Sequence, residues 1–375
     1  SGNVPTVAQA ARELAEIEAQ LGRTAEARAH LEFAVTAARL HGMRLVEAGA
    51  LMGLAKLAML EPSPADAVAL MTQVLAIARD LGYARMETIV LGSLASAQDL
   101  AGDRAACEAS ATASEAIAAR MGYSDLRAHA LAVRGQARFD AGALGAGIAD
   151  LRAAAALAAA EPSTAGAPFA LAALAGPAAW LGDAEGARAA LERRRARART
   201  TGAHERVRMG LVEADVAEAA ERLEEAEALL REALAVETEA ALAAETTAAA
   251  LRLGTFLVER GRDGEAAPLL ERAHEGAVAA GMPGSTTAAR ALLGLVRGED
   301  TATIRIALEA QEHRMPALLA ARIALVLASR RGDAPLAARV RERVERLLAT
   351  TDADDRERAS RSVPLFRRIV GADGR

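Results

Sequence analysis

The sequence predicts an all-α solenoid built from about nine antiparallel helical hairpins. Hydrophobic residues make up 52% of the 375 residues and charged residues 25%, which is the composition of a globular protein. Aromatic residues are only 2%, whereas alanine, the best helix former, is abundant. Helix breakers recur about every 20 residues, and this regular spacing indicates a repeat architecture.

The breakers form two sets that lie half a period apart, each with a period of about 40 residues. The first set comprises Gly22, Pro62, Gly102, Gly142, Gly182, Gly261, Gly298 and Gly332. The second set comprises Gly42, Gly82, Gly122, Pro162, Gly202 and Gly281. This spacing predicts helices of roughly 16–18 residues joined by short turns, so that consecutive helices pack as hairpins.

The second helix of each hairpin carries a small residue shortly after the first-set breaker. These residues are Ala27, Ala67, Cys107, Gly147, Ala187, Ala226, Ala266, Thr303 and Ala337. In most units a larger apolar residue follows one turn later, for example Leu31, Met71 and Leu151. Positions three and four residues apart share one helical face. We therefore expect the small residues to let paired helices approach closely.

This small–large–small pattern resembles the tetratricopeptide repeat (TPR). The segments Leu21–Ala34 and Leu181–Leu191 show it most clearly, although the usual first-helix Trp and Tyr are absent and most units have 40 rather than 34 residues. The longer units resemble the repeats of maltose-regulator-like bacterial signalling proteins. The resemblance covers roughly residues 5–350 and implies a right-handed superhelix whose first helices line a concave, ligand-binding face.

The C-terminal part departs from the repeat, so we divide the chain into a TPR-like array over residues 1–350 and a capping helix with a tail over residues 351–375. The last repeat of a solenoid exposes an apolar face that must be covered. Apolar residues suited to this role are Val363, Leu365, Phe366 and Ile369. We expect Pro364 to bend or interrupt the capping helix.

Bulk properties argue against several classes of protein. The net charge of −5 is not that of a dedicated nucleic-acid binder, and we expect no membrane partner because no apolar window is long enough to span a bilayer. Cys107 is the single cysteine, so no intramolecular disulfide can form, and its packing position predicts a buried, inert thiol. We expect a cytoplasmic location. The start Ser1-Gly2, which lacks Met, suggests a piece of a longer protein.

No motif in the sequence points to catalysis. The six histidines show no metal-binding spacing, and the HExxH, GxSxG and phosphate-loop motifs are absent. The glycines of the segment 142–147 follow no strand and indicate a turn with close packing. We therefore expect a non-enzyme without a cofactor or a metal ion.

The resemblance places a set of first-helix residues on the concave face, where they would form a ligand or peptide groove. They are Met52, Lys56, Met59, Ser96, Asp99, His129, Gln136, Phe139, Asp140, Phe169, Trp180, Arg208 and Asp215. Apolar anchors beside a few charges suit the capture of a peptide. We expect a protein- or peptide-binding scaffold, the sensor or regulatory module of a larger bacterial signalling or transcription-regulating protein. Phe139, Phe169 and Trp180 could instead fill hairpin interiors.

Two alternatives to peptide binding stay open, together with self-association. A small-molecule-sensing repeat domain would show a compact polar pocket rather than a long groove. Nucleic acid, the less favoured partner, would bind a strip between Arg188 and Arg199 whose further members are Arg193, Arg194, Arg195 and Arg197. Apolar end repeats could also pair two chains into a homodimer.

Overall fold

The computed structural model describes residues 4–60, 63–160, 167–196, 202–240 and 243–370. Within these ranges the chain is helical and contains no strand. The helices are α1 (Val4–Gln20), α2 (Thr24–Leu40), α3 (Arg44–Leu60), α4 (Pro64–Asp80), α5 (Ala84–Leu100), α6 (Arg104–Met121), α7 (Ser124–Asp140), α8 (Leu144–Ala160), α9 (Ala167–Trp180), α10 (Ala184–Arg195), α11 (Ala203–Ala219), α12 (Leu223–Ala240), α13 (Ala243–Glu259), α14 (Asp263–Ala279), α15 (Pro283–Val296), α16 (Thr301–Gln311), the 3₁₀ turn η1 (Glu312–Arg314), α17 (Ala317–Arg331), α18 (Ala334–Ala349), α19 (Ala353–Ser362) and α20 (Pro364–Val370).

Consecutive helices pack against each other, and the described residues form nine hairpins from α1–α2 to α17–α18. Each first helix also packs on the helix that precedes it, which stacks the hairpins into a continuous array. The predicted all-α solenoid is confirmed. Among the described residues, no helix combines the length and apolar character needed to cross a membrane.

The turns inside the hairpins explain the first set of breakers. Gly102, for example, has φ 79°, a left-handed conformation that ends α5 and suits a residue without a Cβ. The turn between α11 and α12 has no glycine, and Glu221 takes the left-handed conformation there with φ 60°. The Glu221 carboxylate pairs with Arg367 of α20. Glu221 is the one residue other than glycine with a positive φ in the described chain, and its turn therefore lies beside the last helix.

The small residues of the second helices lie where the pattern predicts in seven of the nine units. Ala27, Ala67 and Cys107 are fully buried, and a Cβ on Gly147 would stand 2.7 Å from the backbone nitrogen of Phe139 in the paired helix. The prediction is wrong for the last two units. In α16, Thr303 is exposed while Ile304 and Leu308 are buried. In α18, Leu336, Val340 and Val344 are buried instead of Ala337 and Arg341. In these two units, which are shorter than the 40-residue repeats before them, the second helix presents a different face to its neighbours.

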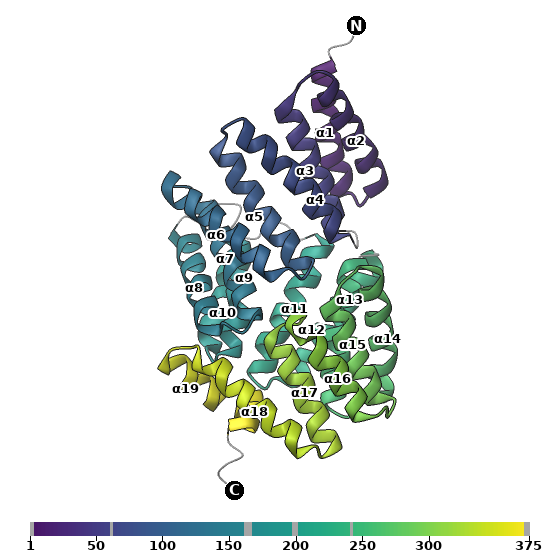
Figure 1. The fold of residues 1–375 in the computed structure, drawn as a ribbon, viewed down its shortest axis with the longest axis vertical. Helices are drawn as coiled ribbons and strands as arrows, with labels where there is room; N and C mark the ends of the chain where they lie inside the picture. Colours follow the sequence, from purple (N-terminus) through teal and green to yellow (C-terminus); the bar gives the residue numbers. More distant parts are fainter. Residues whose placement is uncertain (1–3, 61–62, 161–166, 197–201, 241–242, 371–375) are drawn as a thin grey trace.

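The C-terminal helices fold back onto the middle of the array (Figure 1). Helix α17 contacts α7 and α13, and α18 contacts α8. Two hydrogen bonds of 2.7 Å join the Arg152 guanidinium of α8 to the buried carboxylate of Asp355 in α19. Hydrogen bonding from Arg152, with a smaller contribution from Arg358, lowers the pKa of Asp355. We call these contacts of α17, α18 and α19 with α7–α13 the C-terminal closure.

Glycines in the middle hairpins make room for this closure. A Cβ on Gly145 would lie 2.0 Å from the Thr350 carbonyl oxygen, and one on Gly182 would lie 2.7 Å from that of Arg358. The glycines of the 142–147 segment therefore serve close packing, as the sequence predicts, both within the α7–α8 hairpin and against the C-terminal segment.

The last two helices are separated where proline predicts an interruption. α19 ends at Ser362, Val363 has extended backbone angles, and α20 begins at Pro364. Val363, Phe366 and Ile369 are buried in the main hydrophobic core. The division into an array over 1–350 and a capping segment over 351–375 stays a prediction.

Candidate functional site

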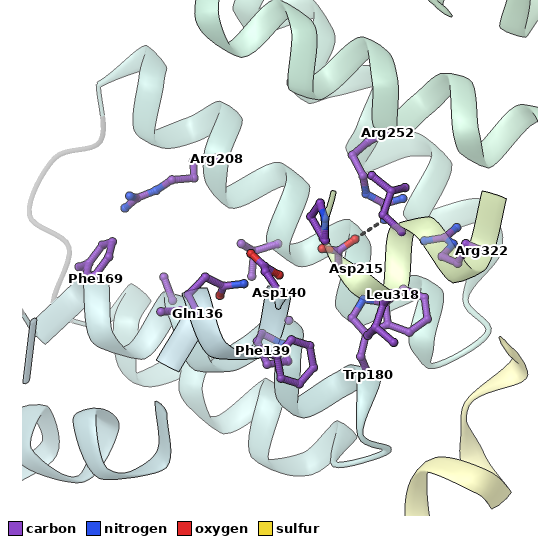
Figure 2. A pocket seen from close by; sticks show the side chains of 17 residues that line it. Gln136, Phe139, Asp140, Phe169, Trp180, Arg208, Asp215, Arg252, Leu318 and Arg322 are labelled. Carbon is purple, nitrogen blue, oxygen red and sulfur yellow. Dashed lines mark hydrogen bonds and ion pairs between the residues drawn. The ribbon is translucent and has the colours of Figure 1, made fainter. Parts of the chain in front are cut away.

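A central cavity of about 420 Å³ lies where the first helices α7, α9, α11 and α13 face α17 (Figure 2). Each of these helices contributes side chains because inward positions recur from repeat to repeat. The lining residues are Gln136, Phe139, Asp140, Phe169, Ala172, Ala173, Gly176, Pro177, Trp180, Arg208, Val212, Asp215, Arg252, Pro316, Leu318, Leu319 and Arg322. Mostly apolar walls with a few polar groups are the usual composition of a ligand site.

Phe169 and Arg208 form one end of the central cavity (Figure 2). The Arg208 guanidinium carbon lies 5.4 Å from the centre of the Phe169 ring, which is a cation–π contact. The Nη2 atom of the same guanidinium pairs with Glu205 at 2.8 Å. The Phe169 ring also packs against His129, with 4.9 Å between ring centres. Phe169 is therefore held in place by two neighbours while it remains part of the cavity wall.

Trp180 and Arg322 form the other end (Figure 2). The Arg322 guanidinium carbon lies 5.1 Å from the Trp180 ring centre. Its nitrogens bind Glu218 at 2.7 Å and Glu259 at 2.8 Å, so one arginine of α17 joins α9, α11 and α13. A second cavity of about 310 Å³ lies beyond, and Trp180 and Arg322 belong to the walls of both.

The charged groups near Arg322 neutralise one another. Arg252 pairs with Asp215 and, at 3.0 Å, with Glu218. Burial would raise the pKa of Glu218, but the charges of Arg322 and Arg252 outweigh it and hold that pKa well below its usual range. Among the described residues, the Nη1 atom of Arg252 is buried without a hydrogen-bond partner. Arg252 therefore lines the cavity with unused donor capacity.

Asp140 differs from these acids because none of the described cations forms an ion pair with it. Burial raises the pKa of its carboxyl to about 7, and the charge of Asp99 adds to this effect. A hydrogen bond from Gln136 and the charge of Arg104 act in the opposite direction. Burial also raises the pKa of Asp99, while Arg104 donates to the His313 carbonyl at 3.0 Å. The Asp140 carboxyl at the cavity wall is therefore only partly ionised near neutral pH.

Helix α9 is unusual at the cavity wall because Pro177 lies inside it. Proline has no N–H, so the Ala173 carbonyl loses its usual helical donor. Gly176 precedes the proline, and all three residues line the cavity. The small side chains of Ala173, Gly176 and Pro177 leave room for the cavity, and larger aromatic residues form other parts of its wall.

The arrangement is suited to binding. Among the described residues, no group of three or more His, Cys, Asp or Glu could hold a metal ion. Cys107 is buried, as its packing position predicts, and burial followed by the charge of Asp99 raises its pKa to about 12. A thiol with this pKa is not a nucleophile at neutral pH.

The structure brings together about half of the predicted groove residues. The cavity contains Gln136, Phe139, Asp140, Phe169, Trp180, Arg208 and Asp215. The cavity lining does not include Met52, Lys56, Met59, Ser96, Asp99 and His129. Lys56 is exposed on α3, and His129 lies behind Phe169, where burial lowers its pKa. Phe139 is only 4% exposed and packs in the hydrophobic core, as expected if it fills a hairpin interior.

Arg252 and the cavity residues of α17 were not predicted from the sequence. Arg252 had a signal: Ala173, Val212 and Arg252 each precede the turn residue of their hairpin by nine positions, and all three line the cavity. No sequence signal identified the α17 residues Leu318, Leu319 and Arg322, because this helix reaches the cavity through the C-terminal closure rather than through the repeat.

The arginine strip is divided between buried and exposed positions. Arg194 is buried and pairs with Glu205, and Arg195 pairs with Glu213 at 2.8 Å. Arg188 and Arg193 lie on the same helix, α10, where Arg193 is exposed. Arg197 and Arg199 lie outside the described residues. The described part of the strip therefore includes arginines already paired with carboxylates.

Comparisons with known proteins identify the fold. No family model and no curated protein sequence matches the chain. A Rap protein complexed with competence and sporulation factor matches with a TM-score of 0.61 and 13% sequence identity over 99% of this chain and 98% of that one. The Rap conjugation gene regulator of the plasmid pLS20, in complex with a Phr peptide, has a TM-score of 0.44 and 13% identity over 96% and 97%. The chain is a TPR-like helical solenoid.

Proposed function

We propose that this chain is a non-catalytic peptide-binding module whose ligand occupies the central cavity. The cavity wall supports this most directly, because it combines aromatic and aliphatic surface with a few separate charged groups. Apolar surface accommodates the side chains of a peptide, while charged groups orient its polar ends.

The second cavity favours an elongated ligand. It lies next to the central cavity, and Trp180 and Arg322 contribute to both. A ligand that reaches from one to the other is extended, as a short peptide is. The matching Rap protein is complexed with competence and sporulation factor, and its fold extends over nearly the same length, which is consistent with a ligand inside this architecture.

We further propose that the module is the sensor or regulatory part of a larger bacterial signalling or transcription-regulating protein. A ligand in the cavity would touch α7, α9, α11 and α17 together. Its binding energy would therefore change the stability of the C-terminal closure. A ligand that favours one state of such an element shifts its population, which is how a signal reaches a partner.

Trp180 offers a direct experiment because it is the single tryptophan of the chain. An N-acetylated, C-amidated hexapeptide library, fractionated on the immobilised protein, would provide the ligands. We expect bound fractions to change Trp180 fluorescence and Phe169→Ala to weaken their binding tenfold or more. Phe33→Ala is the matched control, since Phe33 is 49% exposed on α2. A library without effect on Trp180, or equal affinity in Phe169→Ala, would contradict the proposal.

The compact size of the central cavity supports a small-molecule ligand as the second candidate. A volume of about 420 Å³ is enough for a metabolite. A metabolite collection that changes Trp180 fluorescence, with no response to the peptide library, would favour this candidate.

A further inference from the structure

The chain pairs its buried acids with its own basic side chains. Within the described residues, the buried carboxylates are those of Glu18, Glu47, Asp150, Glu218 and Asp355. Each has a basic partner: His30 for Glu18, Arg39 and Arg44 for Glu47, Arg134 and Arg138 for Asp150, Arg322 for Glu218, and Arg152 for Asp355. Removing a carboxylate from water is costly unless a cation or hydrogen bonds compensate.

Asp140, which is half-buried at the wall of the central cavity, has no such partner in the described part of the chain. Among the described residues, no arginine, lysine or histidine lies within ion-pair distance of its carboxylate. Its neighbours are Gln136 on the same helix, Asp99 on α5, Arg104 on α6 and Asp215 on α11. Asp215 is paired with Arg252, and Arg104 donates to the His313 carbonyl, so the charge of Arg104 acts on Asp140 without an ion pair between the two. Figure 2 places Asp140 between the two aromatic ends of the cavity.

We propose that the ligand of this cavity carries a cationic side chain, lysine or arginine, that pairs with Asp140, next to an apolar side chain that contacts Phe169 or Trp180. This assignment rests on the proposed peptide-binding function and specifies its ligand. The cation supplies at Asp140 the neutralisation that arginines of the chain provide at Glu47, Asp150, Glu218 and Asp355. Arg208, at the Phe169 end of the cavity, is already paired with Glu205 and offers a cation no partner, which leaves Asp140 as its favoured position.

The pH dependence of binding separates a cation from a neutral hydrogen-bond acceptor. A cation needs the ionised carboxylate, so ligand binding releases a proton from Asp140 when the pH is below its pKa of about 7. Affinity should therefore rise about tenfold between pH 6 and pH 8. A ligand carbonyl would instead need the protonated acid as its donor, and affinity would fall over the same range.

The test uses positional-scanning hexapeptide libraries, N-acetylated and C-amidated so that no terminal charge contributes, with Trp180 fluorescence as the readout. We expect one position to prefer lysine or arginine. Asp140→Asn should remove this preference and weaken the selected peptides tenfold or more. Asp125→Asn should keep it, because Asp125 lies on the same helix but pairs with Arg85 at 3.4 Å outside the cavity.

The outcomes distinguish this inference from the proposed function. Peptides that depend on Phe169 but show no cationic preference, or that bind Asp140→Asn equally well, would overturn the inference alone. No peptide response at all would overturn both. The pH profile of the wild-type protein needs no variant: a flat or falling affinity between pH 6 and pH 8 would also contradict the cationic ligand.

Discussion

The first three hairpins and the later ones use the same repeat but differ in what faces them. Helices α1–α4 form an open end of the array, whereas Arg104 of α6 already reaches the His313 carbonyl. At the open end, Val7, Leu14 and Ile17 of α1 and Leu21 just after it are apolar and 43–63% exposed. From α7 onward, the C-terminal closure places α17 opposite the first helices. Both cavities described above are lined only by residues from Gln136 onward. The repeat therefore specifies the hairpins, whereas the cavity depends on the closure.

The largest effect should come from Arg322→Ala, which breaks the closure at its most buried contact. The change removes the shortest shared contact of Glu218 and Glu259, which keep Arg252 and Arg260 nearby, and we expect a loss of about 3 kcal/mol in the free energy of unfolding, measured by chemical denaturation. Arg346→Ala is the control, because Arg346 is 67% exposed and pairs only with a neighbouring turn at Glu342. Equal losses in both variants would contradict the role of the closure.

Asp140→Asn should change how stability depends on pH. The folded-state pKa of Asp140, about 7, lies above its ordinary value of 3.8, so between these values the unfolded chain loses a proton that the folded chain keeps. Wild-type stability therefore falls as the pH rises from 4 to 7, by up to about 4 kcal/mol. The variant should be more stable than wild type at pH 8 and similar at pH 4. Thermal unfolding at both pH values checks this, with Asp125→Asn expected to follow the wild-type curve.

A pair of glycine variants tests the closure with less disturbance. Gly145→Ala places a Cβ against the Thr350 carbonyl and should cost about 1–3 kcal/mol. Gly264 occupies the same second position of its helix, α14, and a Cβ added there would meet nothing within 4 Å. Gly264→Ala should be neutral or stabilising by up to about 1 kcal/mol. A closure that tolerates both changes equally would show that α8 and the α18–α19 turn are not in close contact.

The smallest effect should come from Lys56→Ala at the open end. Lys56 is exposed on α3 and does not line the cavity. We expect a change in stability within about 0.5 kcal/mol and unchanged affinity for library peptides. Weaker binding in this variant would extend the ligand site into the first hairpins.

The repeat features were predictable because they are local. Glycine spacing located the turns, and the small residues of the second helices located the close contacts, with errors only in α16 and α18, where the units shorten. The resemblance to the TPR implied that Phe169, Trp180 and Asp140 lie on the concave face, and all three line the central cavity. It could not reveal Arg322, because α17 reaches the cavity through a contact about 140 residues away in sequence from Trp180, and no periodic pattern encodes that distance.

Hydrogen–deuterium exchange of the wild-type chain, with and without library peptides selected on it, tests the central claim most directly. The account predicts that bound peptides slow exchange in α7, α9, α11 and α17 and leave α1–α6 unchanged. Protection centred on α1–α6, or on α10 with its arginine strip, would contradict a ligand site formed by the C-terminal closure.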